Sequence, residues 1–278
     1  MKPKLLLWMI APAVLLILVT RYIADSSAEE LPNFTDLPQY TLATVAKNEI
    51  DQVRQELIAS FEWKRGGVVT FWFDDAWMSQ YTEGYKLLAD YGYKGSLAVP
   101  TGLLKYEGYI KWWQIKKLQF EGWEISAHSV SHECDPDVLT ADSLEYELRY
   151  SKIEILSHRL LADNYVAPCG VTNEALIALA KTYYKSMRTS EPGINSIPVG
   201  DPYFIKANAI FATTTIDDIR GLLTEAKLAR GWLVLMFHQI DDSGGEYAVT
   251  PEFFQEIVAE VSKSDLQVAL PTQVITIK

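Results

Sequence analysis

Cysteine, histidine and basic residues are all scarce in this 278-residue sequence, which contains two cysteines and four histidines. Two cysteines cannot form a disulfide framework, nor can they supply a zinc site built from four thiolates. The 25 lysines and arginines are outnumbered by 36 aspartates and glutamates, which gives a formal net charge of −11 at pH 7. Because nucleic-acid binding depends on neutralising phosphates with basic side chains, this balance argues against nucleic acid and other polyanions as partners.

Apolar residues are plentiful without dominating the sequence. The chain is 49% hydrophobic and 22% charged, which is enough to bury a full core. This composition excludes a disordered chain, a collagen-like repeat and a polytopic membrane protein. One large domain or two small ones remain.

A single uncharged apolar run near the N-terminus, residues 5–19, follows Lys2 and Lys4 and precedes Arg21. The run is at the upper limit for a signal-peptide core and short of the roughly 20 residues that span the hydrocarbon. We expect residues 1–24 to be an uncleaved signal anchor, with a signal peptide that is cleaved before secretion as the alternative. By the positive-inside rule, the two lysines face the cytoplasm and the rest of the chain lies outside it.

The next segment, residues 25–64, is predicted to be a linker. Residues 25–45 are rich in serine, glutamate, proline and threonine, which is typical of a tether. A polar helix is predicted at about 47–61, and the glycines at 66–67 break its pattern. The folded domain is therefore expected at 65–278.

Beyond residue 67, short apolar runs alternate with amphipathic stretches. The runs predict strands at 68–73, 96–99, 124–127, 165–167, 185–189, 233–237 and 267–270. The stretches predict helices at 78–91, 112–121, 141–162, 173–184, 215–229 and 251–262. About seven β-α repeats favour an α/β fold with a parallel sheet closed into a distorted (β/α)7-type barrel, whose sites gather at the carboxyl ends of the strands.

Three polar clusters each follow a predicted strand. Asp74 and Asp75 end the first strand, His128 and His132 follow the third, and His238 follows the sixth. Adjacent strand residues point to opposite faces, so the two acids can face one ligand only if the strand ends there and the chain turns. A carboxylate with two histidines is a donor set for a divalent metal with open positions for water and substrate, and zinc is the metal we expect.

These clusters resemble the motifs of the polysaccharide deacetylases, the NodB-homology domain of carbohydrate esterase family 4. The likeness covers about residues 65–275. Thr70–Asp75 is similar to the family's Thr-Phe-Asp-Asp motif, with alanine following where glycine is usual. His128 and His132 match the His-Ser/Thr-x-x-His motif, and Met236–His238 is similar to the last motif.

The resemblance implies a role for each polar residue of the three clusters. Asp74 would be the general base and His238 the general acid. Asp75, His128 and His132 would bind the metal.

The family's third motif, Arg-x-Pro-x-Gly, corresponds to Val166–Gly170, where the arginine is missing. A branch of the family carries Phe-Ala-Tyr-Pro-x-Gly-x-x-Asn at this place, and Tyr165–Asn173 is similar to that branch. The family arginine orients the base. We hypothesise that Arg188, at the end of the next predicted strand, pairs with Asp74 in its place.

The resemblance also implies how the substrate is held. The backbone N–H of Cys169, next to Pro168, would donate to the oxyanion, and Met236 would line the acetyl pocket. Trp77 is a candidate sugar subsite, because pyranose faces pack on aromatic rings. Cys134 and Cys169 could form a disulfide in an oxidising compartment or remain free thiols.

The activity that the resemblance implies is metal-dependent removal of N-acetyl groups from an extracellular N-acetylhexosamine polymer, such as peptidoglycan, a chitin-like polymer or poly-N-acetylglucosamine. Two alternatives stay open: an esterase that removes O-acetyl groups from xylan, and a non-catalytic glycan-binding barrel, which the missing arginine motivates. A glycoside hydrolase using Asp74 and Asp75 is disfavoured, since its carboxylates must flank the bond about 5–10 Å apart. The expected partners are an acetylated polysaccharide and, through the N-terminus, a membrane.

Overall fold

The computed structural model describes residues 52, 55–56, 58–59, 61–135 and 139–278. The predicted signal anchor and tether lie outside these residues, as does most of the predicted polar helix. Within the described residues, no helix combines the length and apolar character needed to cross a membrane.

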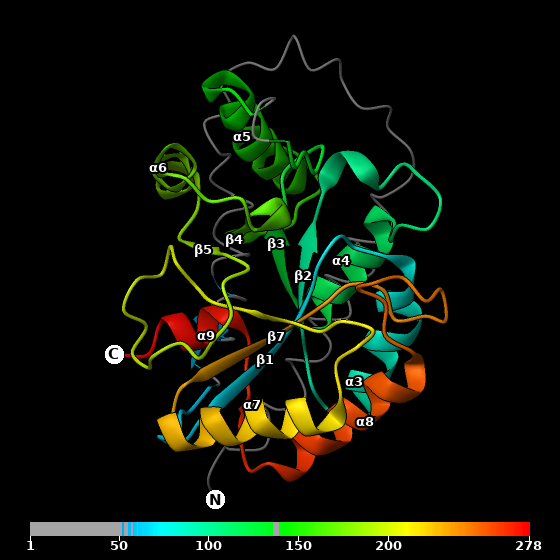
Figure 1. Cartoon of the computed structure of the whole chain (residues 1–278). Helices are drawn as coiled ribbons and strands as arrows, with labels where there is room; N and C mark the ends of the chain where they lie inside the picture. The colour runs from blue at the N-terminus through cyan, green and yellow to red at the C-terminus, as the bar shows by residue number, and fades with distance from the viewer. Residues whose placement is uncertain (1–51, 53–54, 57, 60, 136–138) are drawn as a thin grey trace, which may run out of the picture. The chain divides into compact units, whose positions relative to one another are not determined.

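A parallel β-sheet forms the centre of the described fold (Figure 1). Its strands are β1 (Val68–Phe73), β2 (Ser96–Val99), β3 (Glu124–Ala127), β4 (Ala162–Val166), β5 (Ser186–Arg188), β6 (Asn208–Ala209), β7 (Trp232–Phe237) and β8 (Gln267–Val268). They are ordered β5-β4-β3-β2-β1-β7-β6, and β8 pairs with β1. This order and the parallel pairing confirm the predicted parallel α/β fold.

Helices alternate with these strands along the chain. They are α3 (Tyr85–Asp90), α4 (Trp112–Phe120), α5 (Ala141–Ser157), α6 (Glu174–Tyr183), α7 (Ile216–Ala229), α8 (Pro251–Lys263) and α9 (Pro271–Ile275), with a π-helical turn η2 (Gln80–Gly84) and 3-10 turns η3 (Thr101–Leu103) and η4 (Pro168–Gly170). Figure 1 shows α7 and α8 side by side near β1 and β7, whereas α5 and α6 pack together near β4 and β5.

Several predicted elements differ from the observed ones. The helix predicted at 141–162 ends at Ser157, because Arg159 adopts a left-handed φ of 59° and the N–H of Leu160 bonds back to the carbonyl of Ile155. This is a Schellman C-cap that uses arginine where glycine is the usual signal. The helix predicted at 78–91 contains the π-helical turn η2, and the strand predicted at 165–167 is found at 162–166 as β4. Strand β6 and helix α9 were not predicted.

The sheet curves so that distant strands share its inner face. The side chains of Val166 on β4, Trp72 on β1 and Val234 on β7 belong to one buried apolar cluster. A lone parallel bridge joins Arg188 of β5 to Ile205, shortly before β6, so the two edges approach each other. The closed barrel that the sequence predicts is thus formed in part.

The alternation along each strand separates this inner face from the helices. On β1, Val69, Phe71 and Phe73 join the larger cluster that packs under the helices. Thr70 and Trp72 point to the other side, where the indole N–H of Trp232 donates to Thr70 Oγ1 over 2.8 Å. A residue two positions beyond Trp72 therefore continues the inner face.

His158, the C-cap of α5, gives the fold an acid-sensitive point. Its ring stacks on Trp112 with centroids 3.9 Å apart, and its buried Nε2 has no partner. Burial, with Lys116 nearby, lowers the pKa of His158 from 6.5 to about 4. Above pH 6.5 the imidazole is neutral in both the folded and unfolded states, so the stabilisation from its neutral form is fully present.

As the pH falls from 6.5 to 4, the unfolded chain binds a proton that the folded one does not, and stability is lost. Because the ring is partly exposed, we expect this loss to be no more than about 2 kcal/mol. His158→Phe keeps the stacking and should remove the loss. Urea unfolding at pH 7.5 and pH 5.0 measures it, and an equal drop in variant and wild type would contradict the assignment.

Candidate active site

The inner faces of four strands deliver polar residues to one end of the sheet. Asp74 follows Thr70 and Trp72 in the inward register of β1, and His238 follows Trp232, Val234 and Met236 in that of β7. His128 continues the inward register of β3, and Arg188 ends β5. The sequence predicted this end of the strands as the location of a site, and these side chains do come together there.

Asp75 reaches the same place through a turn in the backbone. Strand β1 ends at Phe73, and Asp75 and Ala76 then adopt left-handed φ values of 74° and 58°. This turn is the condition under which the sequence allowed two adjacent acids to face one ligand. The indole N–H of Trp77 donates to Asp75 Oδ2 over 3.0 Å and so fixes the orientation of the carboxylate.

Asp75, His128 and His132 form a compact group that could hold a metal ion. Asp75 Oδ1 lies 3.3 Å from His128 Nε2 and 3.1 Å from His132 Nε2. His128 Nδ1 lies 2.8 Å from the carbonyl oxygen of Val166. A carbonyl only accepts, so Nδ1 carries the proton, and Nε2 of the neutral ring turns a lone pair toward Asp75.

Lone pairs that face one another at this distance repel unless a proton or a cation lies between them. Oδ1 of Asp75 is buried and makes no well-aligned hydrogen bond. Burial raises the pKa of Asp75, but the two imidazoles lower it by a larger amount. The pKa of Asp75 therefore lies well below its usual range. The donor set, one ionised carboxylate and two imidazoles, therefore fits a divalent cation.

Asp74 forms a buried ion pair with Arg188, the pairing that the sequence led us to hypothesise. The two residues are 4% and 1% exposed, and the pair joins Asp74 Oδ2 to the guanidinium. Strands β1 and β5 are four places apart in the sheet, about 19 Å if the sheet were flat, so the curvature makes this contact possible. Oδ1 of Asp74 is buried without a partner.

Arg188 is itself held by the barrel interior. Its guanidinium lies over the ring of Trp72, 5.3 Å from the centroid, and also contacts the thioether of Met236. Met236, predicted to line an acetyl pocket, thus packs beside the ion pair.

His238 follows β7 and interacts electrostatically with Asp74, Asp75 and His128. Burial lowers the pKa of His238, although the carboxylates of Asp74 and Asp75 oppose this effect. The ring packs against Tyr247, with centroids 4.8 Å apart, and its Nδ1 is buried without a partner.

Gln80, which the sequence did not single out, connects the two residues predicted as base and acid. Its side-chain amide donates to the backbone carbonyls of Asp74, over 2.5 Å, and His238, over 2.8 Å. It lies in η2, a π-helical turn, and such turns are frequent at functional sites. No periodic pattern in the sequence marks this residue.

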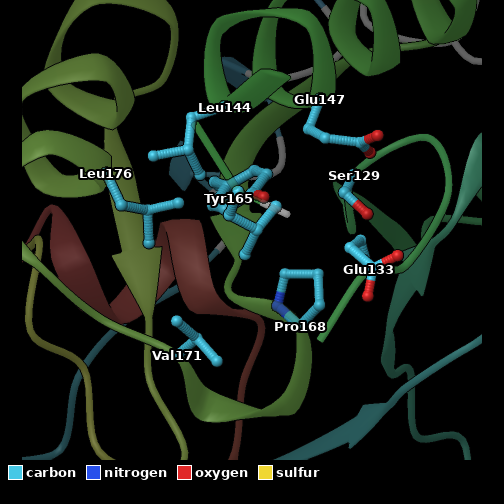
Figure 2. Close-up of a pocket in the computed structure, with 9 residues that line it drawn as sticks. Ser129, Glu133, Leu144, Glu147, Tyr165, Pro168, Val171 and Leu176 are labelled. Atoms are coloured by element: carbon cyan, nitrogen blue, oxygen red, sulfur yellow. The ribbon is translucent and has the colours of Figure 1, made fainter. Parts of the chain in front are cut away.

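Pro168 and a second missed residue, Glu147, border a small pocket beside the loop that carries the histidines (Figure 2). The pocket is lined by Ser129, Glu133, Leu139, Leu144, Glu147, Tyr165, Pro168, Val171 and Leu176. The sequence pattern could have identified Glu147, because it lies between Leu144 and Leu148 on the buried stripe of α5. A charged residue in an apolar stripe is an exception that needs a partner.

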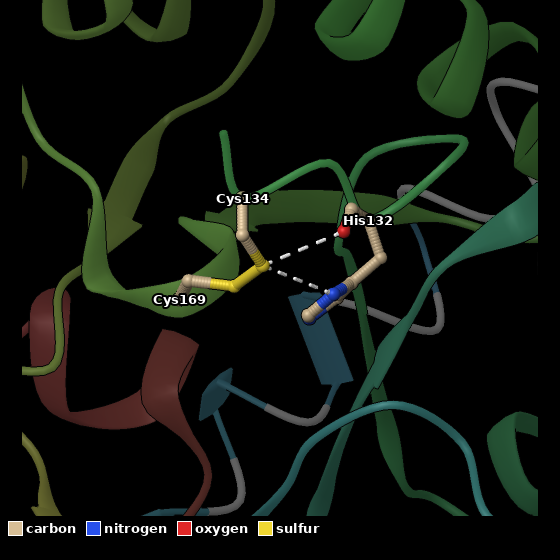
Figure 3. Close-up of side chains that lie close together, drawn as sticks. All are labelled: His132, Cys134 and Cys169. Carbon is tan, nitrogen blue, oxygen red and sulfur yellow. Dashed lines mark hydrogen bonds between the residues drawn. A yellow bond between two sulfur atoms is a disulfide. The ribbon is translucent and has the colours of Figure 1, made fainter. Parts of the chain in front are cut away.

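Cys134 and Cys169 form a disulfide beside His132 (Figure 3). Their Cα atoms are 5.7 Å apart, and the bond joins the loop after β3 to the loop after β4. Cys169 adopts a left-handed φ of 54° in η4. The disulfide resolves the choice that the sequence left open and links the histidine loop to the backbone predicted to donate to an oxyanion.

Trp77, predicted as a sugar subsite, stacks on Tyr109 with centroids 4.6 Å apart. One face of the Trp77 ring thus contacts Tyr109, and its N–H edge is hydrogen-bonded to Asp75. The observed contacts of Trp77 therefore orient Asp75, and the sugar subsite stays a prediction.

Comparison with known proteins bears on the family and the fold of the chain. Residues 63–184 match the model of the polysaccharide deacetylase family. Among curated protein sequences, none matches the chain significantly.

Three solved structures share the fold at low sequence identity. The Xyl-CE4 domain of a multidomain xylanase from the hindgut metagenome of Trinervitermes trinervoides is 14% identical, with a TM-score of 0.53 over 75% of this chain and 89% of that one. The Streptococcus pyogenes deacetylase PplD, solved in complex with acetate, is 22% identical, with a TM-score of 0.53 over 62% and 76%. A pseudoenzyme of the CE4 family from Bacillus anthracis is 15% identical, with a TM-score of 0.52 over 76% and 66%.

Proposed function

We propose that this chain, which matches the polysaccharide deacetylase family over residues 63–184, removes N-acetyl groups from an N-acetylhexosamine polymer outside the cytoplasm, using a divalent metal. The observation that carries the proposal is the convergence of Asp75, His128 and His132 beside a buried Asp74–Arg188 ion pair. A glycan-binding protein without catalysis has no need of an acid and a base around a metal site.

The metal site is formed by Asp75 Oδ1 and the Nε2 atoms of His128 and His132. A bound zinc ion, the metal we propose, would make its water more acidic and polarise the acetyl carbonyl. Val166 and Trp77 keep His128 and Asp75 in their ligating orientations through the hydrogen bonds at His128 Nδ1 and Asp75 Oδ2. Outer partners of this kind typically matter for affinity and activity.

Asp74 is the proposed general base. Arg188 binds Oδ2, so the unpartnered Oδ1 is the atom available to accept a proton from the attacking water. Arg188 thus orients Asp74 as the missing motif arginine would. The backbone N–H of Cys169 is the proposed donor to the oxyanion that forms on the acetyl group.

His238 is the proposed general acid, which gives its proton to the departing amine nitrogen. Gln80 holds the backbone of His238 at a fixed position relative to that of Asp74. The lowered pKa of His238 makes its imidazolium a stronger acid but reduces its population near neutrality. Activity should therefore decline on the alkaline side.

We propose that the protein works outside the cytoplasm and is held there by residues 1–24. The apolar run at 5–19 between basic residues supports this location. The disulfide between Cys134 and Cys169 supports it independently, because such bonds persist in oxidising compartments.

Acetate release from chitooligosaccharides tests the function. The purified protein should release acetate, a chelator should abolish the release, and added zinc should restore it. Release that survives complete chelation would contradict the metal mechanism. Tight glycan binding without any acetate would favour a non-catalytic role like that of the pseudoenzyme that shares the fold.

A further inference from the structure

The loop from His128 to His132 carries two of the three proposed metal ligands, and its backbone conformation is energetically unfavourable for residues other than glycine. Ser129 and His132 adopt left-handed φ values of 63° and 58°. Neither is glycine, and such a conformation costs of order 1–3 kcal/mol per residue and persists only where the surrounding structure imposes it. The loop must therefore be held in place by contacts beyond its own sequence.

Glu147 supplies the densest set of these contacts. Its carboxylate accepts from the backbone N–H of Val130 over 2.7 Å, the N–H of Ser131 over 2.9 Å and the hydroxyl of Ser131 over 2.8 Å. Figure 2 shows its side chain extending from α5 toward the loop at Ser129. All three bonds go to the two residues that lie directly between Ser129 and His132.

The helix that carries Glu147 is firmly packed and capped. Helix α5 buries Leu144, Leu148 and Ile155 against the sheet, and the side chain of Thr140 caps its first turn. Glu147 is only 7% exposed, although it is charged. Burying a carboxylate is costly unless its oxygens are satisfied, and here the donors that satisfy them belong to the metal-binding loop.

We propose that Glu147 is a positioning residue for the metal site, which keeps the His128–His132 loop in its left-handed form so that His132 Nε2 faces Asp75 Oδ1. This inference rests on the metal site of the proposed function. It adds that the affinity for the metal depends on a helix residue that would not touch the ion.

Zinc affinity of the purified full-length protein tests the role without relying on turnover. Glu147→Gln keeps only one oxygen to accept from the loop and removes the negative charge that strengthens these bonds, so zinc binding should weaken by about 10- to 100-fold, the range typical of outer partners of metal ligands. Glu145→Gln is the matched control on the same helix, because Glu145 is 49% exposed. It should bind zinc as the wild type does.

Competition with a chromophoric chelator gives the dissociation constants, and circular dichroism establishes that each variant is folded. Ser131→Ala removes only the hydroxyl bond and should weaken zinc binding by about two- to tenfold, which decides the question if Glu147→Gln does not fold. If Glu147→Gln folds and binds zinc as tightly as the wild type, the proposed role of Glu147 is wrong. If that variant does not fold, wild-type zinc affinity in Ser131→Ala leads to the same conclusion. Neither result would affect the metal site itself. A wild-type protein that binds no zinc would overturn the metal site together with the role of Glu147.

Discussion

Asp74→Asn should bind zinc like the wild type while losing turnover by about 100- to 10,000-fold, the usual contribution of a general base. An amide cannot take the proton of the attacking water at the position of Asp74 Oδ1. The group formed by Asp75, His128 and His132 does not include Asp74, so the zinc affinity should persist. Acetate release and zinc titration on the same preparation measure the two quantities.

The same substitution leaves Arg188 with a buried charge and no anionic partner. Breaking a buried pair from one side typically costs about 3–5 kcal/mol, so assays must be run well below the melting temperature of the variant. Full activity in folded Asp74→Asn would overturn the assignment of the base. Loss of zinc binding would show that Asp74 belongs to the metal site.

His132→Ala should lose both zinc binding and turnover. Removing a ligand should weaken zinc binding by more than about 100-fold, because the loss of a mere outer partner already costs 10- to 100-fold. His158→Phe is the matched control, since His158 stacks on Trp112 and is not one of the three candidate ligands. It should leave zinc affinity and acetate release unchanged.

If His132→Ala keeps both the zinc affinity and the turnover of the wild type, the ion binds elsewhere. Retained zinc affinity with lost turnover would instead give His132 a role in catalysis without ligation. Either outcome would require a new description of the site.

The sheet was predictable because its strands are short, apolar and bounded by clear breaks. Residues 68–73, 96–99 and 124–127 have the bounds that the sequence predicted. The turn at Asp75 was predictable as a requirement, since two adjacent acids cannot otherwise face one ligand. The sequence could not reveal that Ala76 would accept a left-handed φ.

Contacts between distant segments were predictable only where a motif demanded one. The missing motif arginine drew attention to Arg188, and the ion pair with Asp74 is present. Strand β6 has two residues and leaves no periodic signal. Gln80 binds two backbone carbonyls, and Glu147 binds a loop 16 to 17 residues away, so their roles depend on tertiary structure.

The account depends on one cation held by Asp75, His128 and His132, and anomalous diffraction from zinc-soaked crystals of the purified protein tests this most directly. We expect a single strong peak about 2.0–2.2 Å from the Nε2 atoms of both histidines and from a carboxylate oxygen of Asp75. A peak at the neighbouring group of His132, Cys134 and Cys169, or no peak between the two imidazoles, would contradict it.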